Sequence, residues 1–187
     1  MVTFLHRPAF WALAMGFACL ALVHGATLQH LLPILDDRGI SPAMAILAAS
    51  CIGPMQVAGR IAMMVTERHV STHATAVAAF AAMAAAIALL LAASGAPALL
   101  AGFVILFGAA YGVTSIIRPL VARAILGPDN FGAKSGALAL PYLGGAALSP
   151  YLGALIWGMG GYTAMLLTLL GMAALGAVLY MLANRAA

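Results

Sequence analysis

Long apolar runs separated by short polar turns make up most of this sequence. Each run is about as long as, or longer than, the roughly 20 apolar residues that an α-helix needs to cross the hydrocarbon core of a bilayer. Turn-forming and helix-capping residues gather between the runs, where helices end and begin. The pattern therefore predicts an all-α membrane protein with six transmembrane helices at about residues 8–35, 42–66, 72–93, 97–126, 132–157 and 162–184.

The boundaries between the runs carry recognisable signals. Ser41-Pro42 is typical of an N-cap residue followed by a proline in the first helical turn, and Pro97 marks another helix start. Turns are expected at Gly127–Asn130 and at Gly158–Gly161. Prolines also lie inside the runs, and those at Pro54, Pro141 and Pro150 predict bends in the second and fifth spans.

Composition supports a membrane protein and excludes a soluble one. The chain is 65% hydrophobic and only 6% charged, whereas soluble domains have about 25% charged residues. The net charge of +4 does not indicate a nucleic-acid surface, because the basic residues lie singly between apolar runs. Cys19 and Cys51 both fall inside apolar runs and are expected to be free thiols.

The distribution of basic residues predicts the orientation in the membrane. Cytoplasmic loops of membrane proteins carry an excess of Lys and Arg. With a cytoplasmic N-terminus, the outer side of this chain carries only Arg38. The remaining basic residues then lie at the inner side: Arg7, Arg60, Arg68, Arg118, Arg123, Lys134 and Arg185. We therefore expect a single six-helix domain over residues 1–187 in the cell (inner) membrane, with both termini cytoplasmic.

Two halves of the chain echo one another at a separation of about 87 residues. His24-Gly25-Ala26-Thr27 aligns with Tyr111-Gly112-Val113-Thr114, and Pro54 aligns with Pro141. Each half, at about 8–94 and 97–185, holds three spans, so the two copies would have opposite orientations in the membrane. Inverted repeats are typical of secondary transporters. Because Gly and Pro are frequent in this chain, a chance recurrence is the alternative.

Polar residues concentrate in four of the six spans. In the fourth span Tyr111, Thr114, Ser115 and Arg118 lie at i, i+3, i+4 and i+7, on one face of a helix. Hydrocarbon cannot satisfy such a face, so it must contact protein or water. The first, second and fifth spans also carry polar residues, and the third and sixth carry few. Spans one, two, four and five are therefore expected to surround a polar space, with three and six facing lipid. The fifth span also has small residues that permit close helix approach: Gly132, Gly136, Gly145, Ser149 and Gly153.

Several motifs resemble the C-terminal six-helix half of a major facilitator superfamily transporter. They are Gly59-Arg60 followed by Glu67-Arg68, the segment Leu126–Gly132 with Gly136, and Ser149-Pro150 with Gly153. The resemblance covers nearly the whole chain. It implies that spans one, two, four and five line a central cavity and that the loop after span two takes part in cytoplasmic gating. In that loop only the acidic–basic pair is matched, and Met63 stands where the family usually has glycine.

The polar residues of these spans form two groups of candidates. The expected substrate-binding residues are His24, Thr27, Gln56, Tyr111, Thr114, Arg118 and Tyr142, and the expected gating residues are Arg60, Glu67, Arg68 and Arg123. Arg118 either attracts an anionic substrate, pairs with Glu67 in a gate, or extends to the cytoplasmic headgroups. His24 either couples transport to protons, donates to a substrate, or bonds to a backbone carbonyl as a neutral side chain.

Catalytic chemistry is not expected. No GxSG serine motif and no acidic residue occurs within the apolar spans, so neither an enzyme nor a cofactor is predicted. His69 and His73 have i, i+4 metal-ligand spacing, but they lack a third ligand nearby, so no metal site is expected.

These features favour a secondary transporter that carries a small solute, anionic or neutral rather than cationic, by alternating access. Transporters of the superfamily usually have twelve spans, and this chain has six. We therefore expect a homodimer joined through spans one, two, four and five. The alternatives are a structural or regulatory membrane subunit that does not transport, and an isolated half of a twelve-helix carrier.

Overall fold

The structure is a computed structural model that describes residues 3–94 and 96–186. In these ranges every regular element is helical, which confirms the predicted all-α class. The elements are a short 3-10 helix η1 (Thr3–His6) and helices α1 (Pro8–Gln29), α2 (Leu31–Asp37), α3 (Pro42–Thr66), α4 (Thr72–Ala92), α5 (Pro97–Leu126) and α6 (Phe131–Arg185). Five of them are long and apolar enough to cross a membrane.

Helix α6 contains two of the predicted spans. Its 55 residues are interrupted at Gly160 (φ −163°, ψ 20°) and Gly161 (φ 72°, ψ −172°). The positive φ of Gly161 is a conformation that a side chain would oppose, so glycine permits the chain to reverse here. We refer to residues 131–159 as α6a and to residues 162–185 as α6b. With this division the helices match the six predicted spans.

The first predicted span differs from the structure at its outer end. The helix was expected to continue to residue 35, but it breaks at His30 (φ −100°, ψ 7°), and α2 begins at Leu31. Pro33 lies three residues later and has no backbone N–H to donate to the carbonyl of Gln29. Pro33, which lies inside the predicted span, therefore explains the break.

Helix ends follow the local sequence closely. Proline occupies the start of α1, α3 and α5, and Ser41 is the N-cap residue of α3, although its side chain makes no capping bond. Helix α4 is capped by Ser71, whose hydroxyl accepts from the N–H of Ala74 at 3.1 Å. After α5 the chain turns through Gly127 (φ 81°) and Asn130 (φ 51°), as predicted.

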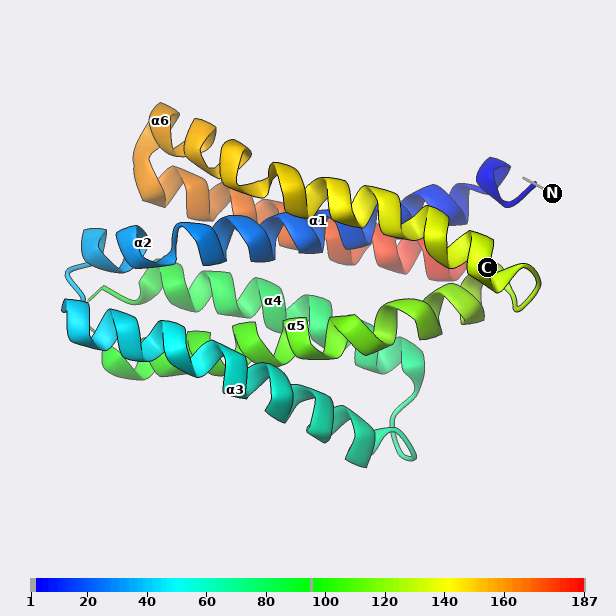
Figure 1. The fold of residues 1–187 in the computed structure, drawn as a ribbon, viewed down its shortest axis with the longest axis horizontal. Helices are drawn as coiled ribbons and strands as arrows, with labels where there is room; N and C mark the ends of the chain where they lie inside the picture. Colours follow the sequence, from blue (N-terminus) through cyan, green and yellow to red (C-terminus); the bar gives the residue numbers. More distant parts are fainter. Residues whose placement is uncertain (1–2, 95, 187) are drawn as a thin grey trace.

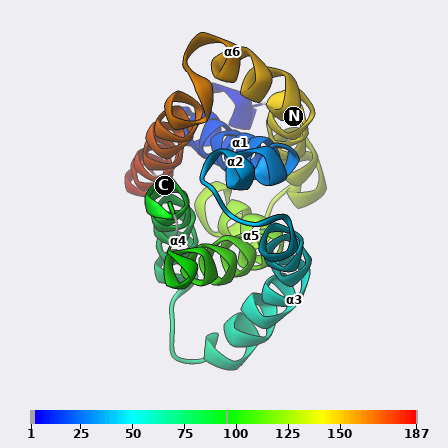
Figure 2. The ribbon, with the colours of Figure 1, turned by 90° about the vertical axis from the view of Figure 1, so that its left-hand side faces the viewer.

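The helices form three layers (Figures 1 and 2). Helices α1 and α5 are central, α3 and α6a flank them on one side, and α4 and α6b cover them on the other. Burial agrees with this order, because α1 is mostly buried and α3 is mostly exposed. Both termini lie at the same end of the bundle as the turn between α5 and α6 (Figure 1).

Small residues allow the central helices to contact their neighbours closely. A Cβ atom added to Gly145 of α6a would lie 2.6 Å from the carbonyl oxygen of Ala18 in α1. On the other side of the bundle, a Cβ atom at Gly112 of α5 would lie 2.1 Å from the carbonyl oxygen of Gln56 in α3. These positions therefore exclude any larger side chain.

The third and sixth spans pack against each other on the side remote from α3 and α6a. The rings of Phe80 in α4 and Tyr180 in α6b stack at 5.5 Å, and the Tyr180 hydroxyl lies 3.0 Å from Nδ1 of His73. Gly16 and Gly176 allow α1 and α6b to approach, with a Cβ atom at either one 3.1 Å from the carbonyl oxygen of the other. This side of the bundle is closed by direct contacts between helices.

At the end opposite the termini, polar side chains connect separate helices. Arg38, after α2, donates from Nη1 to the carbonyl of Leu91 and from Nη2 to the hydroxyl of Thr163 at 3.1 Å. His30 Nε2 lies 3.2 Å from the carbonyl oxygen of Pro150. These contacts join both halves of the chain at this end.

Candidate functional site

Five side chains from three helices form a continuous row near the middle of the bundle. Helix α1 provides His24, α5 provides Phe107, Tyr111 and Arg118, and α6a provides Tyr142. Phe107, Tyr111 and Arg118 lie at i, i+4 and i+11, so one side of α5 carries all three. We refer to these five residues as the aromatic–arginine row.

The imidazole of His24 is held between two rings of α5. Its centroid lies 4.8 Å from that of Phe107, with an interplanar angle of 5°, and 3.4 Å from that of Tyr111, with an angle of 14°. His24 is only 5% exposed. The two rings fix the plane of the imidazole, so its nitrogen atoms can point only along the edge of the stack.

The row continues from Tyr111 to Arg118 through Tyr142. The Tyr142 hydroxyl donates to the Tyr111 hydroxyl at 3.3 Å, and the guanidinium carbon of Arg118 lies 4.0 Å from the centre of the Tyr142 ring. A cation over an aromatic face is attracted by the ring quadrupole. Arg118 therefore extends from α5 across the bundle to α6a.

Some polar atoms of this region have no hydrogen-bond partner among the described residues. They include Nε2 of His24, Oγ1 of Thr27 and Nη1 of Arg118, all of which are buried. Leaving a buried donor or acceptor unpaired costs about 1–3 kcal/mol, and more for a charged group. Unpaired polar atoms grouped in one region favour a site that binds something polar.

The other expected substrate-binding residues have different environments. Thr114 is 1% exposed and donates to the carbonyl of Ala110 at 2.7 Å, so its own helix satisfies it. Thr27 is completely buried on α1. Gln56 is half-buried where the backbone of α3 touches Gly112. The structure thus brings four of the seven candidates into the row: His24, Tyr111, Arg118 and Tyr142.

The expected gating residues are not joined to one another. Arg60 is half-buried and its Nε atom has no partner in the described part of the chain. Glu67 and Arg68 line a cavity of about 300 Å³ between α3, α4 and α5, together with Ile117 and other residues. Arg123 is exposed in the last turn of α5.

Two features of the site region were not anticipated from sequence. Phe107 was read as one more apolar residue, and its position four residues before Tyr111 was the signal that it shares the polar face. Lys134 was read as a topology signal, but it is 9% exposed and its Nζ donates to the carbonyl of Leu126 at 2.6 Å. It satisfies a carbonyl at the C-terminal end of α5, where a positive charge is favourable.

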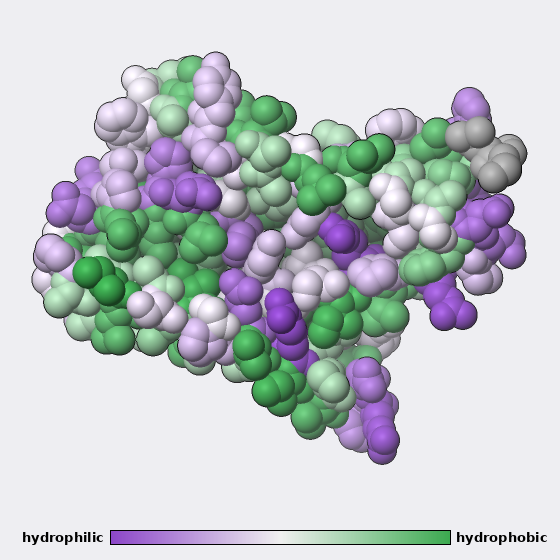
Figure 3. Space-filling model, viewed as in Figure 1, coloured by the Kyte–Doolittle hydropathy of each residue, from purple (hydrophilic) through white to green (hydrophobic). Residues whose placement is uncertain are grey.

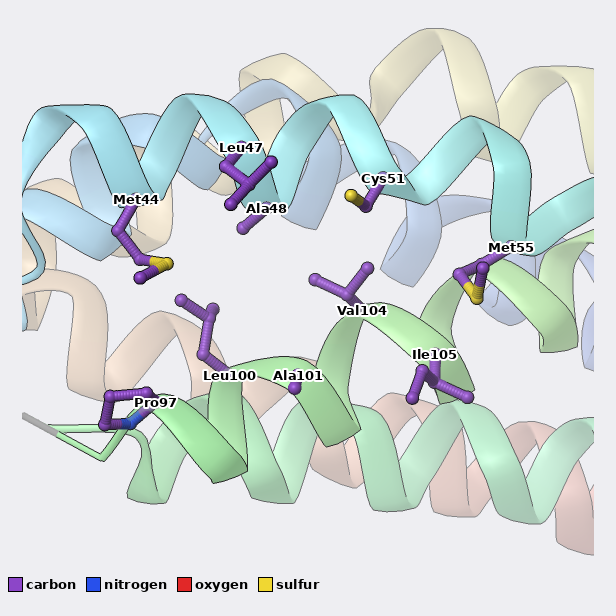
Figure 4. Close-up of a pocket in the computed structure, with 10 residues that line it drawn as sticks. All are labelled: Met44, Leu47, Ala48, Cys51, Met55, Pro97, Leu100, Ala101, Val104 and Ile105. Carbon is purple, nitrogen blue, oxygen red and sulfur yellow. The ribbon is translucent and has the colours of Figure 1, made fainter.

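A second cavity has a different character. It has a volume of about 310 Å³ and lies between α3 and α5, where Cys51 faces Val104 and Met55 faces Ile105 (Figure 4). All ten of its lining side chains are apolar. A cavity without a polar group cannot orient a polar solute, so the aromatic–arginine row remains the better candidate site.

The row belongs to a face formed by α1, α3, α5 and α6a. Figure 3 shows hydrophilic residues in the middle of this face, between apolar surfaces on either side. Ser115, one turn after Tyr111 on α5, is exposed. The side chains of one chain therefore do not enclose this polar region.

No family model matches this chain, and no curated protein matches it.

Proposed function

We propose that this protein is a secondary transporter subunit that moves a small solute by alternating access, with two six-helix bundles working as a pair. The aromatic–arginine row forms one wall of the solute path. The observation that carries the proposal is the grouping of buried, unpartnered polar atoms of His24 and Arg118 beside stacked aromatic rings. A multi-pass membrane protein has no structural need for such atoms at its centre, because each one is costly.

The contacts between the two halves support an inverted repeat. His24 and Tyr111 occupy aligned positions in the two halves, and their rings stack on each other at 3.4 Å. Residues related by a two-fold axis meet in this way when they lie close to the axis. The aligned glycines agree, since Gly25 packs against Ser149 of the fifth span and Gly112 packs against Gln56 of the second. Span one thus contacts span five, and span four contacts span two, which is the pairing that an inverted repeat would produce.

Inverted repeats with a site between them are a recurrent transporter architecture. The resemblance of the chain to the major facilitator superfamily points in the same direction. The excess of basic residues at one end of the bundle favours an orientation in the inner membrane with both termini in the cytoplasm.

We propose that the second bundle is another copy of this chain. The polar middle of the face needs protein or water, because lipid cannot satisfy it. Exposed apolar side chains lie along both edges, including Val57 and Ile61 on α3 and Leu143 on α6a. A Cβ atom added to Gly53 or Gly136 would contact nothing within 4 Å, so these glycines leave room for a neighbouring helix.

The cavity beside Glu67 and Arg68 is assigned to gating in this proposal. It lies at the same end as the termini and borders α5 at Ile117 and Leu120, on either side of Arg118 in the sequence. Movement of α3 relative to α5 would change its shape and with it access to the row. Arg60, on α3, would form alternative ion pairs as the gate opens and closes.

The proposal is tested by the access of water to the row from both sides of the membrane. In a Cys19→Ser, Cys51→Ser background, Ser115→Cys places a thiol of nearly the same size beside Tyr111. We expect a membrane-impermeant thiosulfonate reagent to modify it in right-side-out and in inverted vesicles. Ala81→Cys, exposed at mid-length on the opposite side of the bundle, is the matched control and should remain unmodified.

Equal protection of the two cysteines would contradict a solute path along the row. Modification from one side only would indicate a fixed cavity instead of alternating access. Solute counterflow into proteoliposomes containing the purified chain provides the second measurement, with protein-free liposomes as its baseline.

A further inference from the structure

We refer to the face formed by α1, α3, α5 and α6a as the open face. The charged side chains on the helices of this face are all positive. The chain has four acidic residues. Asp36 and Asp37 end α2, Glu67 is the C-cap residue of α3, and Asp129 lies in the turn before α6. None of them lies within a spanning helix. The spans around the row, in contrast, carry Arg60 on α3 and Arg118 on α5.

Both arginines have donors that the described residues leave unused. Nε of Arg60 and Nη1 of Arg118 are buried and have no hydrogen-bond partner in the described ranges 3–94 and 96–186. The Tyr142 ring stabilises the charge of Arg118 from above its plane, but it does not replace an in-plane acceptor for the N–H groups. A guanidinium presents its donors as a planar fork that fits a carboxylate.

The symmetry of the pair makes the missing counter-charge more significant. A second copy of the chain would add its own Arg60 and Arg118 to the shared space, and it would add no carboxylate. The space between two copies would therefore have an excess of positive charge surrounded by low-dielectric protein. Such a space attracts anions and disfavours cations.

We infer that the solute is a small organic carboxylate, bound through Arg118 and packed against the rings of Tyr111 and Tyr142. This inference rests on the proposed transport function and specifies its substrate class. The carboxylate accepts from the guanidinium, and the Tyr142 ring holds the guanidinium in place. His24 lies on the far side of Tyr111 from Tyr142, between Tyr111 and Phe107, and its Nε2 can bond to a polar substituent of the same solute.

The test compares acids with their uncharged amides, which have nearly the same shape. Purified full-length protein is heated with acetate, lactate or benzoate and, separately, with acetamide, lactamide or benzamide. We expect at least one carboxylate to raise the unfolding temperature and its amide to have no effect. Counterflow of that carboxylate should occur in proteoliposomes, and the amide should not compete with it.

Variants of Arg118 localise the effect. Arg118→Gln should weaken binding of the carboxylate at least about tenfold, because a charge-assisted hydrogen bond is lost. Arg118→Lys keeps the charge but loses the planar fork, so it should bind with intermediate affinity. Arg185→Gln removes an exposed cation at the end of α6 and should bind like the unmodified protein. The unfolding temperature without ligand shows whether each variant is folded.

Two outcomes would overturn the inference. In the first, an amide stabilises the protein and is transported to the same extent as its acid. The solute would then be neutral, and only the charge argument would fail. In the second, no carboxylate has any effect although Ser115→Cys is reached by water from both sides, so the path exists but does not take these anions. Failure of the water-access experiment itself would instead contradict the proposed transport function.

Discussion

At the scale of single residues, the polar side chains fall into two groups. Some make their hydrogen bonds within their own helix, and others reach a neighbouring helix. Thr114 and Ser115 belong to the polar face of α5 that the sequence predicted, yet their hydroxyls donate to Ala110 and Gly112 of the same helix. Ser and Thr can make this bond in any helix. Tyr111 and Arg118 are too long to do so, and they reach α1 and α6a instead. Side-chain length therefore decides which members of a polar face become part of a site.

His24 combines a packing role and a polar role, and two substitutions separate them. His24→Phe keeps a flat ring between Phe107 and Tyr111, so stability should change little. His24→Ala removes both ring contacts and should lower the free energy of unfolding by roughly 1–3 kcal/mol, because each aromatic pair contributes about 0.5–1.5 kcal/mol. Both variants lose the imidazole nitrogens and should lose counterflow.

Denaturation of the purified variants in detergent measures the stability difference, and proteoliposomes measure the flux. A His24→Phe variant that transports as well as the unmodified protein would show that the imidazole is only a packing element. In that case the unpartnered Nε2 atom would have no part in binding the solute.

At the scale of helices, the apolar runs and the residues that separate them were sufficient to place the spanning elements, although not the short helix α2. The boundaries of α3, α4 and α5 agree with the predicted spans to within one residue, because proline, serine and glycine mark where a helix can begin or end. The broken end of α1 shows where this prediction of helix boundaries fails. A proline inside an apolar run can bend a helix or end it, and tertiary contacts of residues such as His30 decide which occurs.

The close contacts of the small residues in α6a agree only in part with the prediction. Gly145, Ser149 and Gly153 do contact α1, through Ala18, Gly25 and His30. Gly132 and Gly136 were expected to allow the same kind of approach, but a Cβ atom added to either one would meet none of the described residues within 4 Å. Sequence spacing identifies small residues on a helix, but it does not identify the neighbour that they face.

Glycines that contact a neighbouring helix and glycines that face open space give a matched pair of substitutions. In Gly112→Ala the new methyl group would overlap the backbone of Gln56, so α3 and α5 must separate, with a cost of about 1–3 kcal/mol or more. Gly136→Ala places the same methyl group in open space, and the higher helix propensity of alanine should stabilise the monomeric bundle by up to about 1 kcal/mol.

Unfolding temperatures of the two variants in detergent provide the comparison. If both variants unfold at the same temperature, α3 and α5 do not approach as closely as the structure indicates. A loss of dimer in Gly136→Ala without a loss of monomer stability would place this glycine at the surface between copies.

At the scale of the whole molecule, the six-helix bundle is closed by ring contacts on one side and exposes polar side chains on the other. Phe80 and Tyr180 seal the side formed by α4 and α6b. The opposite face carries Arg60 and the aromatic–arginine row between apolar edges. Sequence reasoning anticipated this division from the uneven distribution of polar residues among the spans. It could not show that His24 and Tyr111 stack, because their contact joins residues of different halves.

The geometry of the open face predicts how two copies would meet. Helices α3 and α6a lie at its opposite edges (Figure 2). A two-fold axis along the membrane normal brings α3 of one copy against α6a of the other. Val57 lies fifteen residues after Pro42, and Leu143 lies sixteen residues before Met159, both counted from the same end of the bundle. At about 1.5 Å per residue they lie at nearly equal depth.

The test uses two differently tagged variants that lack Cys19 and Cys51, one carrying Val57→Cys and the other carrying Leu143→Cys. We expect the two variants to form a mixed dimer in membranes, in which a short bis-maleimide links the two cysteines. The control pair is Val57→Cys with Leu175→Cys, whose position on α6b is equally exposed but lies on the closed side. Linkage of the first pair alone supports an isologous dimer through the open face. Equal linkage of both pairs would indicate random collision in the bilayer. If neither pair is linked, a second copy does not cover this face, and the solute path must be completed by a different six-helix partner.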